Sequence, residues 1–186
     1  MKITARTPLR DVATAVGHAL AEHGIRAILT GGACASLHSD GAYLSQDIDF
    51  ILAGRVAVST LDAAMAASGF VRRANRYVHP ESPFWVEFPR GPLAVGADLK
   101  IEPRPLGPEP SGTLALTPTD SCRDRLAAFY HWNDRQSLEV AILIAVRNEI
   151  DHDLVRRWSS GEGHLARYEE FRRELARRID LHGSQA

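Results

Sequence analysis

The strongest constraint on the fold is a change of pattern at residues 103–112. This stretch, PRPLGPEPSG, holds four of the ten prolines of the 186-residue chain. Because proline fixes φ and removes a backbone donor, such a segment is typical of a stiff connector. Short β-prone runs dominate before it, and apolar residues at helical spacing dominate after it. We therefore predict an α/β (α+β) fold, in which a small mixed β-sheet with helices on one side (residues 1–111) is followed by a C-terminal helical bundle (residues 112–186).

The part before the connector alternates between helical and strand patterns. Apolar residues recur at helical spacing across residues 8–23, and Gly24 ends that helix. After the connector, a helix is expected to begin with Thr117 as N-cap, Pro118 at N1 and the acidic Asp120 at N3. The other predicted elements are strands at 26–30, 47–52, 70–73, 76–79, 84–88, 98–102 and 113–116, and helices at 33–38, 56–68, 138–150 and 165–179.

Composition and charge exclude several classes of protein. The net charge is −1, and basic and acidic residues balance on both sides of the connector, so neither part is a basic nucleic-acid domain as a whole. No apolar run approaches the roughly 20 residues of a membrane span, and the first residues lack the features of a signal peptide. Cys34 and Cys122 are too few for a disulfide framework. We expect a cytoplasmic protein with two reduced thiols and no membrane partner.

Asp47 and Asp49 form the pattern that is most directly tied to chemistry. They alternate with Ile48 and Phe50, so in a strand both carboxylates point to one face, with Cα atoms roughly 6–7 Å apart. At an effective dielectric near 20, two carboxylates about 6 Å apart repel by about 3 kcal/mol. A bound Mg²⁺ or Mn²⁺ would reverse this term, because hard divalent cations take oxygen ligands. The simpler alternative is that both aspartates lie on the solvated face of an edge strand.

Two glycines directly after the preceding strand add a feature that suits phosphate. Gly31 and Gly32 let the backbone approach a phosphate group, and amides at a following helix start can bind it. The order strand, glycine pair, short helix, then Ser45-x-Asp47-x-Asp49 resembles the nucleotidyltransferase superfamily of the DNA polymerase beta type. It looks closest to the minimal and toxin-like branches, which include abortive-infection and toxin–antitoxin nucleotidyltransferases.

The resemblance implies a role for each matched residue. It covers roughly residues 26–102 and makes residues 1–111 the catalytic core. Asp47 and Asp49 match the two catalytic, metal-binding acids, while Gly31, Gly32 and Ser45 match residues on the nucleotide side of the site. In the helical part, Arg125 stands where the toxin-like branch generally has Lys, and Asp134 matches a recurring acid. Because arginine keeps its proton at neutral pH, we expect Arg125 to stabilise negative charge on the nucleotide.

The superfamily commonly uses a third carboxylate from a later strand, and two residues are candidates. In the run 84–88, Glu87 shares a face with Trp85, opposite three apolar residues that suit a helix layer. Asp98 follows Gly96 closely, a place where an acid is often only a turn or cap residue. We assign Glu87 to the catalytic and metal-binding set and keep Asp98 as the alternative.

Two further polar clusters allow two interpretations each. Arg72, Arg73 and Arg76 are either a solvated strand face or a clamp on triphosphate or RNA. Residues 131–135, HWNDR, either pack and cap a helix junction or line the cleft between the two parts. Neither cluster has a spacing that decides between its two interpretations.

The function implied by the resemblance is metal-dependent nucleotidyl transfer. The enzyme would use Mg²⁺ or Mn²⁺ to move a nucleoside monophosphate from a nucleoside triphosphate to a hydroxyl of an RNA 3′ end or a protein. It could act as the toxin of a toxin–antitoxin system, with an antitoxin as partner. The alternatives are a catalytically inactive binding module with the nucleotidyltransferase fold and a small-molecule (antibiotic) nucleotidyltransferase.

Overall fold

A computed structural model describes residues 2–106 and 112–183 of the chain. In this part of the chain, seven strands form one mixed sheet in the order β3-β4-β5-β2-β1-β7-β6. The strands β2 and β5 run parallel, as do β1 and β7, and all other neighbours are antiparallel. The strands are β1 (Ala27–Thr30), β2 (Asp47–Leu52), β3 (Val71–Arg73), β4 (Arg76–Val78), β5 (Trp85–Glu87), β6 (Arg104–Pro105) and β7 (Leu114–Ala115).

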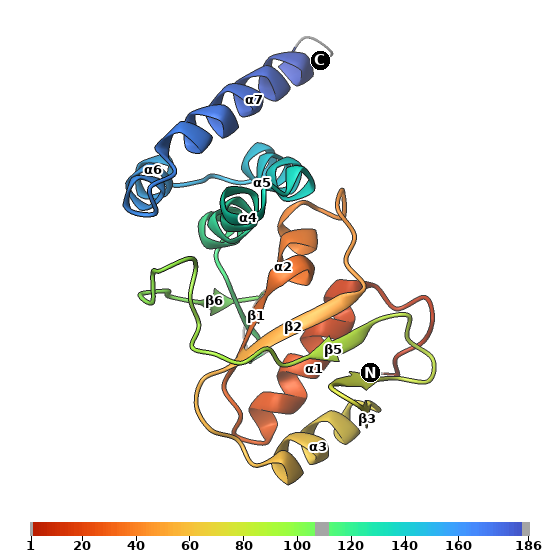
Figure 1. Ribbon diagram of the computed structural model, residues 1–186. Coiled ribbons are helices and arrows are strands. Elements are labelled where there is room, and N and C mark those ends of the chain that lie inside the picture. The colour runs from red at the N-terminus through yellow and green to blue at the C-terminus, as the bar shows by residue number, and fades with distance from the viewer. Residues whose placement is uncertain (1, 107–111, 184–186) are drawn as a thin grey trace.

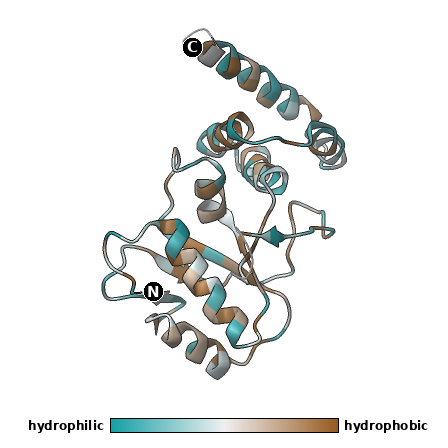
Figure 2. Ribbon diagram, turned by 180° about the vertical axis from the view of Figure 1, so that it is seen from behind, coloured by the Kyte–Doolittle hydropathy of each residue, from teal (hydrophilic) through white to brown (hydrophobic). Residues whose placement is uncertain are grey.

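Helices cover one face of this sheet. The helices α1 (Leu9–Glu22) and α3 (Val58–Ala67) lie together on the face seen in Figure 2, and the opposite face of β2 and β5 is turned to the viewer in Figure 1. Apolar side chains from α1, α3 and the central strands form a common buried core between them. The predicted mixed sheet with helices on one side, followed by a helical region, is therefore confirmed.

A second core lies in the C-terminal helical region (Figure 1). Its helices are α4 (Pro118–Trp132), α5 (Arg135–Arg147), α6 (His152–Gly161) and α7 (Leu165–Gly183). The predicted cap of the first of them is confirmed, since the Thr117 hydroxyl accepts from the backbone N–H of Asp120 at 3.1 Å and Pro118 occupies the first turn. The helix α2 (Gly31–His38) continues directly from β1 and packs against α4, so it joins the sheet to the helical region.

The buried side chain of Arg123 in α4 connects the segment around residue 98 to the helical region. Only 2% of Arg123 is exposed, and its guanidinium forms ion pairs with Asp120, at 2.8 Å, and with Asp98. The same guanidinium lies 5.0 Å from the ring centre of Trp158 in α6, whose indole N–H donates to the backbone carbonyl of Val95 at 3.2 Å. The segment around residues 95–98 is therefore fixed against α4 and α6.

The ion pair between Arg123 and Asp98 explains one of several differences between the predicted and the observed elements. The predicted strand at 98–102 is wrong, because within these described residues Asp98 makes only an isolated bridge with Val95 and turns its side chain to Arg123. The helix α6 was not predicted. Strand β7 follows residue 111, the predicted boundary, yet it pairs with β1 and belongs to the sheet. Residues 107–111 of the predicted connector lie outside the described residues.

Within residues 2–106 and 112–183, no helix is both long enough and apolar enough to cross a lipid bilayer.

Candidate active site

Asp47 and Asp49 lie on the sheet face that α1 and α3 leave free. Ile48 and Phe50 are fully buried in the core beneath the helices, so the alternating aspartates point to the opposite face, where both are half-buried. The strand β2 that carries them lies between β1 and β5. The alternative of an edge strand is therefore wrong: both aspartates stand near the middle of the sheet, where two like charges cost more than at a solvated edge.

The glycine pair allows the backbone of α2 to approach both carboxylates. Gly31 adopts a positive φ of 61°, and a Cβ at this position would collide with the carboxylate of Asp49. A Cβ on Gly32 would lie 2.5 Å from the hydroxyl of Ser45, which donates a hydrogen bond to the carboxylate of Asp47. The glycines form the first turn of α2 itself, rather than a turn before a helix at residue 33 as predicted.

This arrangement sets the N-terminus of a helix beside the aspartates. The first backbone N–H groups of α2 have no partner within the helix, and the helix dipole makes this end partly positive. Thr30, the N-cap, pairs with Asp49 across β1 and β2. A phosphate that bridged the helix start and a cation on the aspartates would therefore meet favourable charge from both sides.

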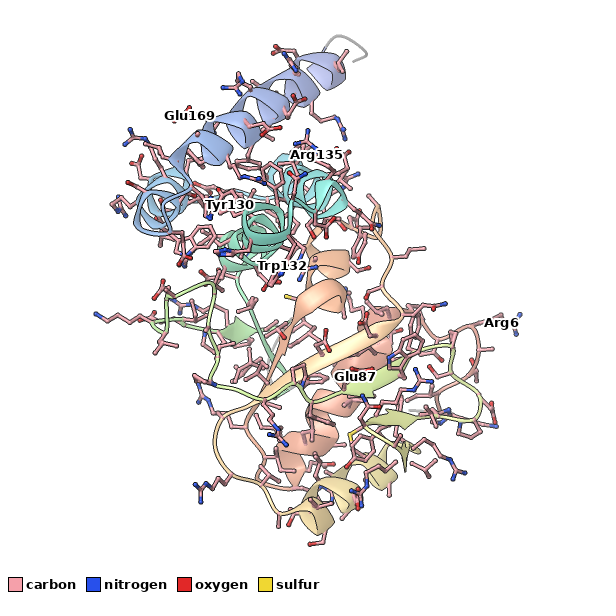
Figure 3. All side chains as sticks on the ribbon, viewed as in Figure 1. Arg6, Glu87, Tyr130, Trp132, Arg135 and Glu169 are labelled. Carbon is pink, nitrogen blue, oxygen red and sulfur yellow. The ribbon has the colours of Figure 1, made fainter. Side chains whose placement is uncertain are left out.

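Glu87 and Asp98, the two candidates for a third carboxylate, occupy different surroundings. Glu87, which is labelled in Figure 3, lies opposite Asp49 in the parallel pair of β2 and β5. Its carboxylate accepts a hydrogen bond from the indole N–H of Trp85 at 3.0 Å. Asp98 instead pairs with Arg123, which lowers the pKa of its carboxyl group. The register thus places Glu87, and not Asp98, beside the two aspartates.

Arg125 of α4 is the cation that acts on this group of acids. Its charge lowers the pKa of Asp49, although burial and the carboxylates of Asp47 and Glu87 outweigh it and raise that pKa to about 6. Burial by itself would lower the pKa of Arg125, but Asp124, together with Tyr43 and Asp49, raises it, so the guanidinium is charged. The site therefore holds more negative than positive charge around a half-buried carboxylate.

The donor set fits a divalent cation held by two carboxylates. Among the described residues, no group of three or more His, Cys, Asp or Glu side chains is arranged to hold a metal ion. The carboxylate of Glu87 is hydrogen-bonded to the indole N–H of Trp85, and that of Asp47 to the hydroxyl of Ser45. Burial and the neighbouring carboxylates of Asp47 and Glu87 raise the pKa of Asp49, and a bound cation would offset both effects. Magnesium commonly takes one or two protein carboxylates and completes its shell with phosphate and water oxygens.

Three residues that sequence reasoning did not assign to the site also lie around it. Asp124 accepts from the guanidinium Nε of Arg125 at 3.1 Å, and the Tyr43 hydroxyl lies 3.3 Å from the Cβ position of Gly32. Arg76 lies opposite Glu87 in the pairing of β4 with β5, with its guanidinium 4.8 Å from the centre of the Trp85 ring. Of the three, only Arg76 carried a sequence signal, as a member of the arginine cluster.

Other residues considered from the sequence have structural roles. Arg72 forms an ion pair with Asp62 at 2.9 Å. Asp134 is the N-cap of α5, where its carboxylate accepts from the backbone N–H groups of Gln136 and Ser137. Cys34 is a free, fully buried thiol, and its burial raises the pKa well above the usual range, so it is not a reactive nucleophile.

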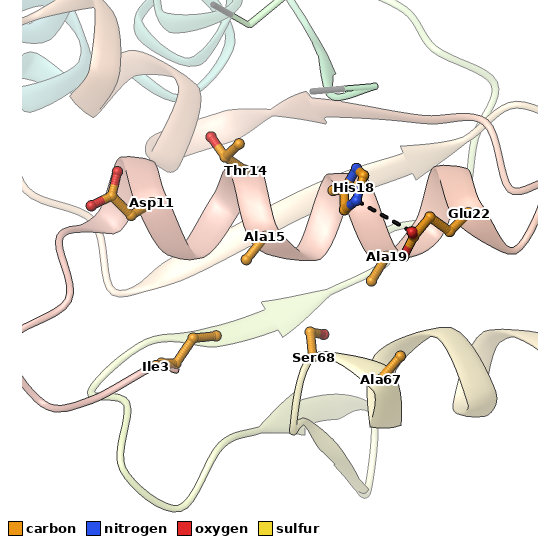
Figure 4. A pocket seen from close by; sticks show the side chains of 9 residues that line it. All are labelled: Ile3, Asp11, Thr14, Ala15, His18, Ala19, Glu22, Ala67 and Ser68. Atoms are coloured by element: carbon orange, nitrogen blue, oxygen red, sulfur yellow. Dashed lines mark ion pairs between the residues drawn. The ribbon is translucent and has the colours of Figure 1, made fainter. Parts of the chain in front are cut away.

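A pocket lies between α1 and α3 (Figure 4). These helices cover the sheet face opposite to that of the aspartates. It is lined by short apolar and polar side chains, with one exposed pair between His18 and Glu22 at 3.4 Å. None of the residues expected from the sequence to act on a nucleotide contributes to it.

A pair of substitutions separates the roles of Glu87 and Asp98. If the chain transfers nucleotides, as the sequence resemblance implies, Glu87→Gln is expected to abolish that activity with little change in the free energy of unfolding, because it removes a charge beside Asp49 and keeps a hydrogen-bond acceptor for Trp85. Asp98→Asn is expected to retain most activity and to cost about 1–2 kcal/mol of stability, because the buried Arg123 loses a charged partner. Label transfer from α-labelled nucleotide and denaturant unfolding measure the two effects.

The exposed Glu81→Gln is the matched control for the first substitution, because it removes a carboxylate charge from the same hairpin away from Asp49. If Asp98→Asn abolished transfer while Glu87→Gln left it intact, the assignment of Glu87 would be wrong.

We compared the chain with protein-family models, with curated proteins and with solved structures, and none of the three comparisons found a match.

Proposed function

We propose that this chain is a metal-dependent nucleotidyltransferase that uses a nucleoside triphosphate as donor. The observation that carries the proposal is the half-buried pair Asp47 and Asp49, which meets the glycine start of α2 and the charge of Arg125 on one face of the sheet. A carboxylate pair in such surroundings is costly unless a cation shares it. The sequence resemblance to the polymerase-beta type of nucleotidyltransferase supports the same assignment.

In the proposed reaction, each group around the face has a separate task. Asp47 and Asp49 hold Mg²⁺ or Mn²⁺, and Ser45 keeps the carboxylate of Asp47 in place through its hydrogen bond. The cation, when bound, neutralises charge on the triphosphate and on the leaving pyrophosphate. The backbone N–H groups at Gly31 and Gly32 and the guanidinium of Arg125 bind and orient the phosphates.

The chemical step exchanges one phosphorus–oxygen bond for another. The acceptor hydroxyl oxygen forms a bond to the α-phosphorus, and the bond between that phosphorus and the bridging oxygen to the β-phosphate breaks, so pyrophosphate leaves. The hydroxyl proton passes to the carboxylate of Glu87 or to water. Catalysis therefore rests on positioning and on electrostatic stabilisation of the phosphates.

The acceptor that we favour is a macromolecule, namely an RNA 3′ end or a protein hydroxyl, as in the toxin-like proteins that the sequence resembles. A cytoplasmic location and an antitoxin as partner belong to this proposal. A small-molecule acceptor such as an antibiotic is the second candidate, and an inactive module that binds nucleotide is the third.

Binding and transfer are tested on the same preparation. We expect at least one of ATP, CTP, GTP and UTP to raise the melting temperature in the presence of Mg²⁺ but not in EDTA, because the cation links the carboxylates to the phosphates. Incubation with the four α-labelled nucleotides and a cell extract is then expected to label RNA or protein.

The outcomes separate the three candidates. Label that appears only on added aminoglycoside would assign a small-molecule acceptor. Metal-dependent binding without any transfer would favour the inactive module. If none of the four nucleotides stabilised the protein at millimolar concentration with Mg²⁺, the nucleotide site itself would be disproved.

A further inference from the structure

Trp132 is a strongly exposed aromatic residue of the helical region. It is the last residue of α4, and 77% of it is accessible to solvent. Single exposed apolar residues are common and by themselves indicate no function, but the indole ring of Trp132 offers a large aromatic surface to a partner. The residues beside it are engaged: His131 faces Glu162 at 3.5 Å, and Asn133 accepts from Arg167 at 3.1 Å.

The end of α4 that carries Trp132 is held rigidly. Arg167 of α7 donates to the backbone carbonyl of Phe129 at 2.6 Å and lies 4.9 Å from the centre of its ring. The guanidinium of Arg135 lies 5.3 Å from the centre of the same Phe129 ring. The His131 ring meets the Trp132 ring edge-on at 6.0 Å. These contacts hold the helix end that carries Trp132 in place, so the backbone at this residue has little freedom to lose when the indole ring binds a partner.

Helix geometry relates Trp132 to the candidate active site. Arg125 and Trp132 are seven residues apart on one continuous helix, so they share a face and lie about 10 Å apart along its axis. Between them on this face, Ala128 offers only a methyl group. In Figure 3, Trp132 lies at the edge of α4 nearer the sheet. The distance is similar to that between the base and the outer phosphates of a nucleoside triphosphate.

We propose that Trp132 is the stacking platform for the base of the nucleoside triphosphate, and that it gives the site a preference for purines. This inference rests on the proposed nucleotidyl transfer and names its substrate more closely. With the phosphates at Arg125 and the aspartates, a nucleotide extended along α4 brings its base to the indole ring. Stacking on an indole ring needs no hydrogen-bond pattern, and it favours the larger purine rings because they cover more of the aromatic surface.

Comparison with inorganic tripolyphosphate separates the contribution of the base to the binding affinity from that of the phosphates. Calorimetric titrations with ATP, CTP and tripolyphosphate, all with Mg²⁺, are compared for the wild type, Trp132→Ala and Trp132→Phe. Trp132→Ala is expected to weaken ATP binding by about tenfold or more, the loss of one base–aromatic stack, and to leave tripolyphosphate binding unchanged. Trp132→Phe is expected to keep most of the affinity. The excess of ATP over CTP affinity is expected to shrink in Trp132→Ala.

Leu181→Ala is the control, since it removes another exposed apolar side chain, in α7, that is 62% accessible. Equal losses for ATP and tripolyphosphate, or an unchanged affinity for ATP, would overturn the assignment of Trp132. Unchanged ATP binding with lost transfer to RNA would instead show that Trp132 binds the acceptor, which also overturns it. If the wild type bound neither ligand, the proposed function would fail and this inference with it, whereas equal wild-type affinity for ATP and tripolyphosphate removes this inference alone.

Discussion

Asp49→Asn is expected to lower nucleotidyl transfer by at least about a hundredfold and, in the same protein, to raise the melting temperature measured at pH 8 in EDTA. Activity falls because an amide is a poor ligand for Mg²⁺ compared with a carboxylate. Stability rises because burial and the carboxylates of Asp47 and Glu87 hold the pKa of Asp49 at about 6, above the ordinary aspartate pKa of 3.8. The folded protein therefore favours the protonated, neutral form of this side chain.

Proton linkage determines whether Asp49→Asn raises or lowers the stability of the protein. Between pH 3.8 and about 6, the folded state binds more protons at Asp49 than the unfolded state, so wild-type stability falls as pH rises through this window. Asparagine does not titrate, and its advantage over the wild type should be absent below pH 4, grow across the window and stay constant above it. Since Asp49 is only partly buried, solvent screening limits the gain to about 1 kcal/mol, or roughly 2–4 °C.

A thermal-unfolding series from pH 3.5 to 8.5, with and without Mg²⁺, checks both halves of this prediction. Mg²⁺ should stabilise the wild type but not Asp49→Asn, so the advantage of the variant should disappear when the cation is present. Asp40→Asn is the control, because Asp40 is exposed and has a positive φ that asparagine also accepts. A destabilised Asp49→Asn at pH 8 in EDTA would show that the carboxylate is structural.

Alternation along single strands made much of this site predictable. Ile48 and Phe50 had to face a core, which fixed the direction of Asp47 and Asp49, and the run around Val86 fixed Glu87 in the same way. The N-cap at Thr117 followed from residues three positions apart. In each case the signal and the contact it predicts lie within a few residues, so local geometry was sufficient.

Contacts between distant segments could not be predicted in this way. Asp98 looked like part of a strand, but its partner Arg123 lies 25 residues away, and an ion pair with a buried guanidinium outweighs a weak strand preference. Similarly, the effect of Arg125 on Asp49 depends on how α4 packs against α2. The helix α6 has a strong apolar face around Val155 and Trp158, but its high content of charged residues obscured that signal.

The glycine pair gives the second large effect: Gly31→Ala is expected to abolish transfer and to cost at least about 2 kcal/mol of stability. A positive φ by itself costs an alanine about 1 kcal/mol relative to glycine. The new Cβ would also collide with the carboxylate of Asp49, so either this side chain or the start of α2 must move. Both are parts of the proposed phosphate and metal site, and a displacement on the order of 1 Å is enough to remove most activity.

Gly24→Ala is a matched control that the chain itself provides. Gly24 has a φ of 69°, close to the 61° of Gly31, but nothing lies within 4 Å of the position that a Cβ would take. The substitution should therefore cost only the backbone term and leave transfer intact. Subtracting its effect on the free energy of unfolding from that of Gly31→Ala isolates the cost of the collision with Asp49.

A double-mutant cycle identifies the group responsible. If the carboxylate of Asp49 is the obstacle, Gly31→Ala in an Asp49→Ala background should cost about as much stability as Gly24→Ala does in the wild type, since most of the colliding atoms are gone. Additive costs of the two substitutions would show that Gly31 and Asp49 do not touch, and the close approach of helix start and carboxylate would be wrong. A large coupling energy would establish that the glycine is required to bring the first turn of α2 against the carboxylate on β2.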